Sequence, residues 1–569
     1  MLQTHQYPQQ DEHVYLAFAT QFLDIFHHPS RDAFLQIIEV NRYRQPLYGL
    51  FLTCVLFFTG TAYTYKIVLW LNVLFYLITV ISIYFLGKEF MSKKASVLAA
   101  YIFAFYGFPL FYLHFTYSET AVTAFTILPL LFLAKSKNLS NRKYTIFFSI
   151  FFLLGGLTRW VVPLFISGSF VDSLIHGVFR QYKKKTRNIQ AFAINISLVV
   201  LIGILPAVLI LYGPNIFYFR KYISQNVAYG PQWMQTIVHP DLPGIQNAFS
   251  IHSVMFYFNI LSEQTIFFFF LFVVGFLHCL RHVKHYGFFL FGFIFPYCIF
   301  TFASVLKFDR YIVPLYPMMA LCSAVTFDYL KNKKVKLLLV AITIIFGFLN
   351  FLGSSWAIGP MGRQGLKDIV MPSFFPHPRR IYLTPMVWPP RPEELNAEKM
   401  FTIIQKDFAG KNRIPFILQT FQYSPYNNAM YTIVAYEKRN IFSYTMIFNE
   451  DYLTLFQNLN RSDYMLVKDK NPIDIYYNNP QSSEGYTLTI MMRKFNNVLE
   501  ENPSALQPAF ERLAVIPLPL DKSNIIVYKK NEKITRQDFE NFGMLLEKQY
   551  PEDMSEIENA MNTVYPDKL

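Results

Sequence analysis

Cysteine is scarce in this sequence, and its few cysteines lack the spacing typical of a disulfide framework or a zinc site. The chain has 569 residues and four cysteines, all inside apolar runs: Cys54, Cys279, Cys298 and Cys322. These four are therefore expected to be small core residues. A disulfide-stapled domain and a zinc-finger protein are both excluded.

Acidic residues are also few. The chain has 37 Asp and Glu against 51 Lys and Arg, which gives a net charge of +14. A basic excess can indicate nucleic-acid binding, but here most clustered positive residues lie in short loops between apolar segments. In a membrane protein such loops set the orientation. We therefore expect membrane lipids as partners and no nucleic acid.

Apolar residues, by contrast, exceed the range of an ordinary cytosolic enzyme, at 53% hydrophobic and 18% aromatic. The excess lies between residues 48 and 356, whereas charged residues recur throughout from residue 359. The Pro-rich run 360–392 between them cannot be a continuous helix or a central strand. We predict an external acidic loop with juxtamembrane helices (1–65), a transmembrane domain (66–356), a linker (357–395), an α/β domain (396–531) and an acidic tail (532–569).

Ten apolar segments predict transmembrane helices near 67–87, 95–113, 118–134, 144–158, 160–178, 191–213, 264–280, 286–305, 310–328 and 337–356. Most are long enough, at ~1.5 Å per residue, to cross a hydrocarbon core of ~30 Å. The loops 88–94, 135–143, 180–187, 281–284 and 331–336 hold 18 Lys and Arg and share one side when the spans alternate. That side should be cytoplasmic. The remaining loops and the C-terminal domain are then extracytoplasmic, in a multi-pass protein of the inner or plasma membrane.

The apolar segment 48–60 is shorter than the ~17 residues usually needed to cross. If it crosses, Asp11 lies inside; if it lies in the interface, Asp11 stays outside beside Glu119. We favour the interface, because Arg42, Arg44 and Pro46 suit the start of a juxtamembrane helix.

The C-terminal part alternates between helix-like and strand-like segments, which predicts an α/β layer with a mainly parallel sheet. Helices are expected at 397–408, 426–437, 451–458 and 491–500, and strands at 415–420, 441–447, 464–468 and 524–528. The domain has no Gly-rich phosphate loop and no catalytic acid cluster, so an acceptor-binding or structural role is expected. The acidic tail should be a helix with a disordered end.

Five motifs occur in an order that resembles a known family: DEHVYLAFA, RQPLYGLF, GKEFMSKKASVLAAYIFAFYGFPLFYLHFTYSETAV, GGLTRWVVPL and DRYIVPLYPMMAL. From residue 8 to residue 352 the chain resembles GT-C glycosyltransferases of the protein O-mannosyltransferase and lipid A aminoarabinose transferase type. The resemblance implies transfer of a hexosyl or pentosyl group from a polyprenyl-phosphate donor to a glycan, lipid or protein acceptor at the outer face of the membrane.

The resemblance also implies roles for individual acids. The family's catalytic acid in the first external loop corresponds to Asp11, with Glu12 as its neighbour, and a second acid corresponds to Glu119, where the family more often has Asp. The family has a transmembrane helix before the acidic loop, whereas this chain reaches Asp11 after ten residues without an apolar run. Either the start is truncated or the N-terminus is translocated unaided, and we favour truncation.

Glycosyl transfer needs a carboxylate that takes or orients the proton of the nucleophile, and cations that stabilise the leaving phosphate. The expected donor-binding residues are Arg44, Arg159, Lys307, Arg310 and Tyr311. Arg159 and Arg310 begin spans, so snorkelling to the headgroups is an equal alternative for both. No metal ligands are assigned: His239 and His252 lack ligand spacing. The sequence predicts no cofactor and leaves a divalent cation open.

Two other functions stay open. A transporter or flippase would also be polytopic, but it should have an internal repeat and charged residues near mid-membrane. No convincing repeat is found, and the main carboxylates lie in predicted external loops. A polysaccharide polymerase or ligase would use the same lipid donors, so only the order of the motifs separates it from the transferase.

Overall fold

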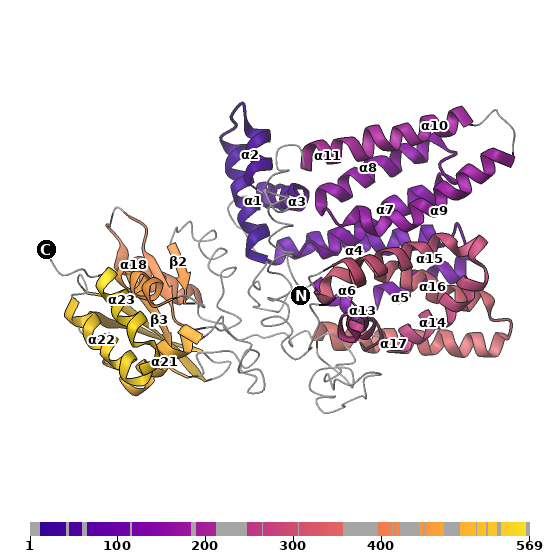
Figure 1. Ribbon diagram of the computed structural model, residues 1–569. Coiled ribbons are helices and arrows are strands. Elements are labelled where there is room, and N and C mark those ends of the chain that lie inside the picture. The colour runs from indigo at the N-terminus through magenta and orange to yellow at the C-terminus, as the bar shows by residue number, and fades with distance from the viewer. Residues whose placement is uncertain are drawn as a thin grey trace.

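The structure is a computed structural model, and its helical N-terminal part leads into a smaller part with a sheet (Figure 1). It describes residues 12–40, 45–59, 65–113, 117–183, 189–211, 247, 249–263, 266–304, 307–356, 397–411, 413–421, 443–447, 451–470, 490–507, 509–518, 522–531 and 536–564.

The N-terminal part consists of helices, and each predicted span coincides with a helical segment. The helices are α1 (Glu12–His27), α2 (Ala33–Val40), α3 (Pro46–Thr59), α4 (Tyr65–Gly87), α5 (Lys93–Ala104), α6 (Gly107–Tyr112), α7 (Glu119–Lys135), α8 (Arg142–Thr158), α9 (Val162–Lys183), α10 (Ile189–Leu198), η1 (Val199–Ile204), α11 (Leu205–Leu211), α13 (Ile251–Glu263), α14 (Ile266–Arg281), α15 (Val283–Cys298), η3 (Ile299–Ala303), η4 (Asp309–Leu315), α16 (Tyr316–Tyr329) and α17 (Lys333–Trp356).

Four predicted spans are not regular α-helices. The span 95–113 breaks between α5 and α6, because Pro109 has no N–H to donate to the carbonyl of Phe105. The Asn350 amide donates to that carbonyl instead, at 3.3 Å. The spans 191–213 and 286–305 each contain a π-helical stretch, η1 and η3, and the span 310–328 begins in the 3-10 helix η4.

Six helices of the described chain are long and apolar enough to cross a membrane. They cover Leu69–Gly87, Val162–Phe179, Ile189–Ile210, Val283–Ala303, Arg310–Tyr329 and Lys333–Leu352, and a bent pair formed by α13 and α14 can add a seventh. α7 and α8 have 17 residues each. The membrane character is confirmed, and the number of about ten spans stays a prediction.

The described residues of the five basic loops lie together at one end of the helices. Ser92 donates its backbone N–H to the Asp328 carboxylate at 2.8 Å, and a ring nitrogen of His285 lies 3.0 Å from the Phe90 carbonyl. Lys135 lies over the Phe85 ring, 5.3 Å from its centroid. The end of α9 joins this group, because Gly177 packs against the Asn138 carbonyl. This arrangement agrees with the alternating threading of the spans.

The expectation that all four cysteines are core residues is wrong for one of them. Cys279 and Cys322 are buried and Cys298 is intermediate, but Cys54 is exposed on α3. The same helix exposes Phe57 and Phe58. An apolar sequence therefore did not reveal which face of α3 packs inward, because both faces are hydrophobic.

The C-terminal part has a five-stranded sheet with strand order β2-β1-β3-β5-β4. Its strands are β1 (Phe416–Gln419), β2 (Ser443–Met446), β3 (Tyr464–Lys468), β4 (Phe510–Leu518) and β5 (Ser523–Lys530). β1 is parallel to β2 and β3, whereas β5 is antiparallel to β3 and β4. The sheet is thus mixed rather than mainly parallel, because the β4–β5 hairpin closes one side. The helix expected at 426–437 lies outside the described residues.

Helices cover both faces of this sheet. α18 (Ala397–Phe408) packs on the face that carries Ile417, whereas α20 (Tyr452–Arg461) and α21 (Ile490–Glu501) pack on the face that carries Leu418. Adjacent residues of a strand point to opposite faces, which separates the two cores.

The acidic tail contributes to the second of these cores. It has two helices, α22 (Arg536–Gln549) and α23 (Met554–Val564), joined by η7 (Pro551–Asp553), and Phe542, Leu546 and Ile557 are buried with α20 and α21. The described part of the tail thus packs as an integral part of the domain.

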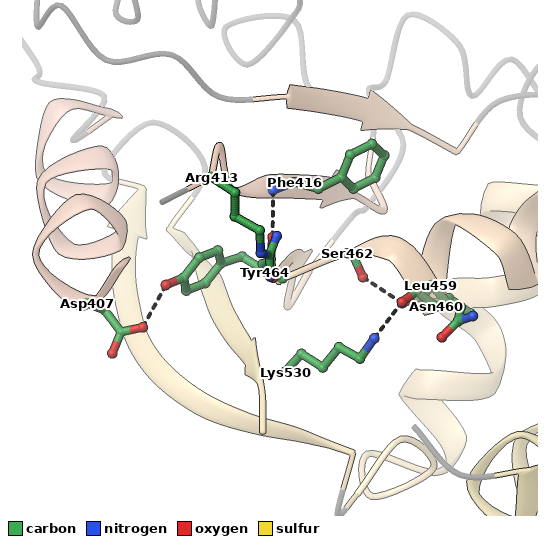
Figure 2. Close-up of polar contacts among 9 residues, drawn as sticks. Asp407, Arg413, Phe416, Leu459, Asn460, Ser462, Tyr464 and Lys530 are labelled. Carbon is green, nitrogen blue, oxygen red and sulfur yellow. Dashed lines mark hydrogen bonds and ion pairs between the residues drawn. The ribbon is translucent and has the colours of Figure 1, made fainter. Parts of the chain in front are cut away.

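Polar contacts fix the strand ends in this domain (Figure 2). The Tyr464 hydroxyl donates to Asp407 at 2.6 Å, and the backbone N–H of Phe416 donates to Asp463 at 2.9 Å. Arg413 forms two bonds to the same Asp463 carboxylate. These side chains hold the starts of β1 and β3 together, which is a structural role.

Candidate functional site

The candidate site centres on Glu119, the first residue of α7. Its side chain is only 2% exposed, and its Oε1 accepts a bond of 2.6 Å from Arg159 Nη1. The N-terminal end of a helix favours a carboxylate. Arg159 follows α8 in an extended conformation. Because α7 and α8 pack as an antiparallel pair, the end of α8 comes back beside the start of α7.

A second guanidinium approaches the same carboxylate oxygen. Arg310 Nε lies 4.0 Å from Glu119 Oε1. Its guanidinium lies over the rings of Tyr117 and Tyr311, 5.5 and 5.9 Å from their centroids, and Arg159 lies over Tyr311 at 5.4 Å. The structure therefore places two cations and one carboxylate around the Tyr311 ring, with a local excess of positive charge.

The charge on Arg159 is held by its partner. Burial disfavours the guanidinium cation, but the adjacent Glu119 carboxylate outweighs this effect and raises the pKa of Arg159 above its ordinary value. The Glu119 carboxylate thus stabilises the charged form of the buried Arg159 guanidinium.

Glu119 keeps one oxygen unused within the described chain. Its Oε2 is buried and has no hydrogen-bond partner among the described residues. Buried carboxylate oxygens are nearly always bonded. An oxygen of this kind, beside two cations, can accept a bond from a substrate hydroxyl or amine.

Lys307, three residues before Arg310 in the chain, is fully buried. Its Nζ donates to the Phe300 carbonyl at 2.8 Å and to the Thr301 carbonyl, at the end of the π-helix η3, and lies over the Tyr257 ring at 5.4 Å. Burial lowers the pKa of Lys307 to about 8. The structure thus gives this lysine a capping role, and its contact with a donor phosphate stays a prediction.

Most of the first acidic loop lies outside the described residues, and its nearest described element is α1. Asp11 and Arg44 lie outside the described residues, and Glu12 begins α1 with its side chain outside them. Three residues further on, the Tyr15 hydroxyl lies 2.8 Å from Ser118 Oγ. The start of α1 therefore lies beside the start of α7, next to Glu119.

The sequence interpretation missed one polar residue of this region. Asn72 is fully buried in α4, and its Oδ1 accepts bonds from the Tyr48 hydroxyl at 3.0 Å and from Thr120 Oγ1 at 2.9 Å. A single Asn within an apolar span was the available signal, because such residues are costly in a membrane unless they are bonded.

Metal ligands are not gathered in the described chain: no group of three or more His, Cys, Asp or Glu there can hold an ion. The carboxylates of Asp11 and Glu12 are outside that search. A divalent cation therefore stays open.

Comparisons with known proteins show the fold. No protein-family model and no curated protein sequence matches the chain. The chain is similar to the structure of ArnT from Cupriavidus metallidurans in the apo state, with a TM-score of 0.50 and 11% identity over 92% of this chain and 94% of that chain. The same protein bound to undecaprenyl phosphate gives 0.49, with 12% identity over 92% and 95% of the two chains.

A third similar structure is the archaeal oligosaccharyltransferase AglB from Archaeoglobus fulgidus, at 0.47 and 12% identity over 86% of this chain and 69% of that chain. ArnT, a lipid A aminoarabinose transferase, and AglB are both GT-C glycosyltransferases. The match to apo ArnT confirms the predicted GT-C fold. The chain is thus an integral membrane protein with the fold of a GT-C glycosyltransferase.

Proposed function

We propose that this protein is a glycosyltransferase that moves a sugar from a polyprenyl-phosphate donor to a glycan, lipid or protein acceptor at the outer face of the membrane. The observation that carries the proposal is the buried Glu119, whose Oε1 is bonded to Arg159 while Oε2 has no partner in the described chain. The GT-C fold supports the same function, since ArnT has this fold.

The reaction assigns a task to each side of the site. The acceptor hydroxyl or amine donates its proton to a carboxylate, that of Glu119 or Asp11, while its oxygen or nitrogen attacks the anomeric carbon of the donor sugar. The bond between that carbon and the phosphate oxygen breaks, and the lipid phosphate leaves with the electron pair. Arg159 and Arg310 stabilise the negative charge that develops there.

The remaining assignments follow from the same arrangement. Tyr311 lies under both guanidinium groups and positions them, and Arg44 and Lys307 are the further cations proposed for the donor phosphate. The outer-face location rests on the five basic loops, whose described residues lie at the opposite end of the helices from Glu119. The C-terminal domain is then extracytoplasmic, where it can bind the acceptor.

The test uses purified protein in lipid vesicles with a panel of polyprenyl-phosphate sugars and candidate acceptors. Glu119→Gln keeps the shape and removes the charge, so it should lower kcat ~10²- to 10⁴-fold. Asp11→Asn should do the same if that residue is the base. Glu89→Gln is the matched control, because Glu89 is exposed in a basic loop at the other end. Wild-type protein without transfer from any lipid-linked sugar would refute the proposal.

One observation favours the alternative of a transporter. Asp172 is only 7% exposed within the candidate span Val162–Phe179, and its Oδ1 lies 3.4 Å from His176 Nδ1. Ionisable residues inside a span are typical of transport pathways. The transferase proposal expects Asp172→Asn to keep kcat near the wild-type value. A transporter would instead move lipid-linked sugar across the vesicle membrane without transfer and would lose this movement in Asp172→Asn.

A further inference from the structure

Three consecutive residues at the start of α7 are each tied to a different part of the fold. Ser118 Oγ lies 2.8 Å from the Tyr15 hydroxyl of α1, and Glu119 is bonded to Arg159 after α8. Thr120 Oγ1 donates to Asn72 Oδ1 of α4 at 2.9 Å. The position of Glu119 is therefore set by contacts on both of its neighbours in the chain.

Asn72 is the hub of these contacts on the α4 side. Its Oδ1 accepts bonds from Thr120 of α7 and from the Tyr48 hydroxyl of α3, and Asn72, Tyr48 and Thr120 are all buried. Burying an amide in apolar surroundings destabilises a protein when the amide is not hydrogen-bonded. An apolar residue would avoid that cost but would leave two buried hydroxyls without their acceptor.

The start of α7 also forgoes the usual helix cap. Ser118 occupies the N-cap position, but within the described chain its side chain makes no capping bond to the helix. A serine side chain at this position typically stabilises a helix by accepting a bond from a free backbone N–H. Its hydroxyl instead faces Tyr15 of α1. The hydroxyls on both sides of Glu119 are thus directed at neighbouring helices rather than at α7 itself.

We propose that Asn72 is a positioning residue for the transfer reaction. Through Thr120 it fixes the first turn of α7, so that Glu119 Oε1 stays on Arg159 and Oε2 stays directed at the acceptor. The inference rests on the proposed function. A displacement of about 1 Å in a reacting group can lower a rate ~10²-fold, so loss of one bond beside Glu119 should affect turnover more than binding.

Thr120→Val tests this position directly, because it keeps the shape of the side chain and removes the bond to Asn72. It should lower kcat about 10- to 100-fold, while KM for the lipid-linked donor stays near the wild-type value. Asn72→Leu should have the same effect, and Thr120→Ser, which keeps the hydroxyl, should restore most of the rate.

Thr126→Val is the matched control on the same helix. Thr126 is equally buried, but its hydroxyl donates to the Val122 carbonyl within α7, at 2.8 Å. This variant should keep its kcat. If Thr120→Val and Thr126→Val lower the thermal stability alike and leave kcat alike, the contact to Asn72 is only structural and the proposal is overturned.

A variant in the background of Glu119→Gln separates positioning from general damage. Since Asn72 acts through the Glu119 carboxylate, Thr120→Val should cause little further loss of kcat once that carboxylate is gone. A full additional loss would contradict the inference while leaving the proposed function intact. Wild-type protein without transfer would overturn both, because no reaction would then exist for Asn72 to support.

Discussion

The ion pair between Glu119 and Arg159 makes a quantitative prediction about stability. The two side chains are 2% and 18% exposed, and their closest atoms are 2.6 Å apart. Removing one member of a buried pair typically destabilises a protein by about 3–5 kcal/mol, because the other charge stays buried. The partial exposure of Arg159 and the nearby Arg310 Nε, 4.0 Å from Glu119 Oε1, reduce that figure. We expect Arg159→Met to cost about 2–3 kcal/mol.

The second single variant acts on the same pair from the other side. Glu119→Gln leaves the Arg159 and Arg310 guanidinium groups without the carboxylate that both of them face. At an effective dielectric constant of about 20, two unit charges 4 Å apart interact by ~4 kcal/mol. The double variant Glu119→Gln with Arg159→Met should therefore be more stable than the sum of the single losses predicts. A coupling of roughly 2 kcal/mol is expected for groups in direct contact.

The assay compares apparent melting temperatures of the detergent-solubilised variants at one fixed heating rate, because large membrane proteins often unfold irreversibly. Coupling then appears as a shift in the double variant that is smaller than the sum of the two single shifts. Arg142→Met is the control, since Arg142 is exposed at the start of α8 and should change stability by less than about 0.5 kcal/mol. Strictly additive single losses would show that the pair is not coupled, and the electrostatic argument for the site would then fail.

Three further predictions concern a buried amine, the C-terminal core and the membrane orientation. Burial lowers the pKa of Lys307 to about 8, so between pH 8 and about 10.5 the unfolded chain holds a proton that the folded protein has lost, and stability should rise with pH. The rise should be absent in Lys307→Met, measured by melting temperature against pH; an equal rise in both proteins would contradict the burial argument. Asp553 accepts a bond of 2.5 Å from the Tyr452 hydroxyl and an ion pair from Lys494, so Asp553→Asn should cost about 1–3 kcal/mol and speed hydrogen exchange in α23. Glu556→Gln, at an exposed position, is the control. Equal hydrogen exchange in the two variants would show that the contacts of Asp553 do not stabilise α23. For orientation, in protein without its native cysteines, Lys94→Cys should be protected from an impermeant thiol reagent in cells and Lys411→Cys should react, since both positions are exposed; the reverse pattern would refute the outer-face site.

The helices of the N-terminal part follow largely from its apolar runs, because a long segment without charge can span a membrane as a helix and has few other stable structures. The breaks in these helices do not. The gap between α5 and α6 depends on Pro109 together with Asn350, a residue far along the chain that bonds the Phe105 carbonyl. In the C-terminal part, β4 was not predicted because a register shift between Arg512 and Ala514 interrupts its alternation of buried and exposed residues. Both features depend on tertiary contacts.

The site could be predicted in part for a similar reason. Charge alternation between loops placed Glu119, Arg159 and Arg310 at one end, and the structure brings their side chains into contact. Whether Asp11 and Arg44 join them stays a prediction, because both lie outside the described residues. Asn72 could not be assigned, since an isolated amide in an apolar span has no pattern that identifies its partners before the helices are packed.

The charges of the site connect its structure with the proposed chemistry. A carboxylate at the start of α7 is favoured by the N-terminal end of the helix and by the adjacent Arg159 guanidinium. Arg310 adds a second cation that one carboxylate cannot neutralise. The described site thus carries an excess of one positive charge, which suits a phosphate whose negative charge grows as the sugar leaves. The contacts that hold Ser118 and Thr120 keep the carboxylate aligned with these cations. The rigidity of the first turn of α7 and the chemistry proposed for Glu119 therefore depend on the same few hydrogen bonds.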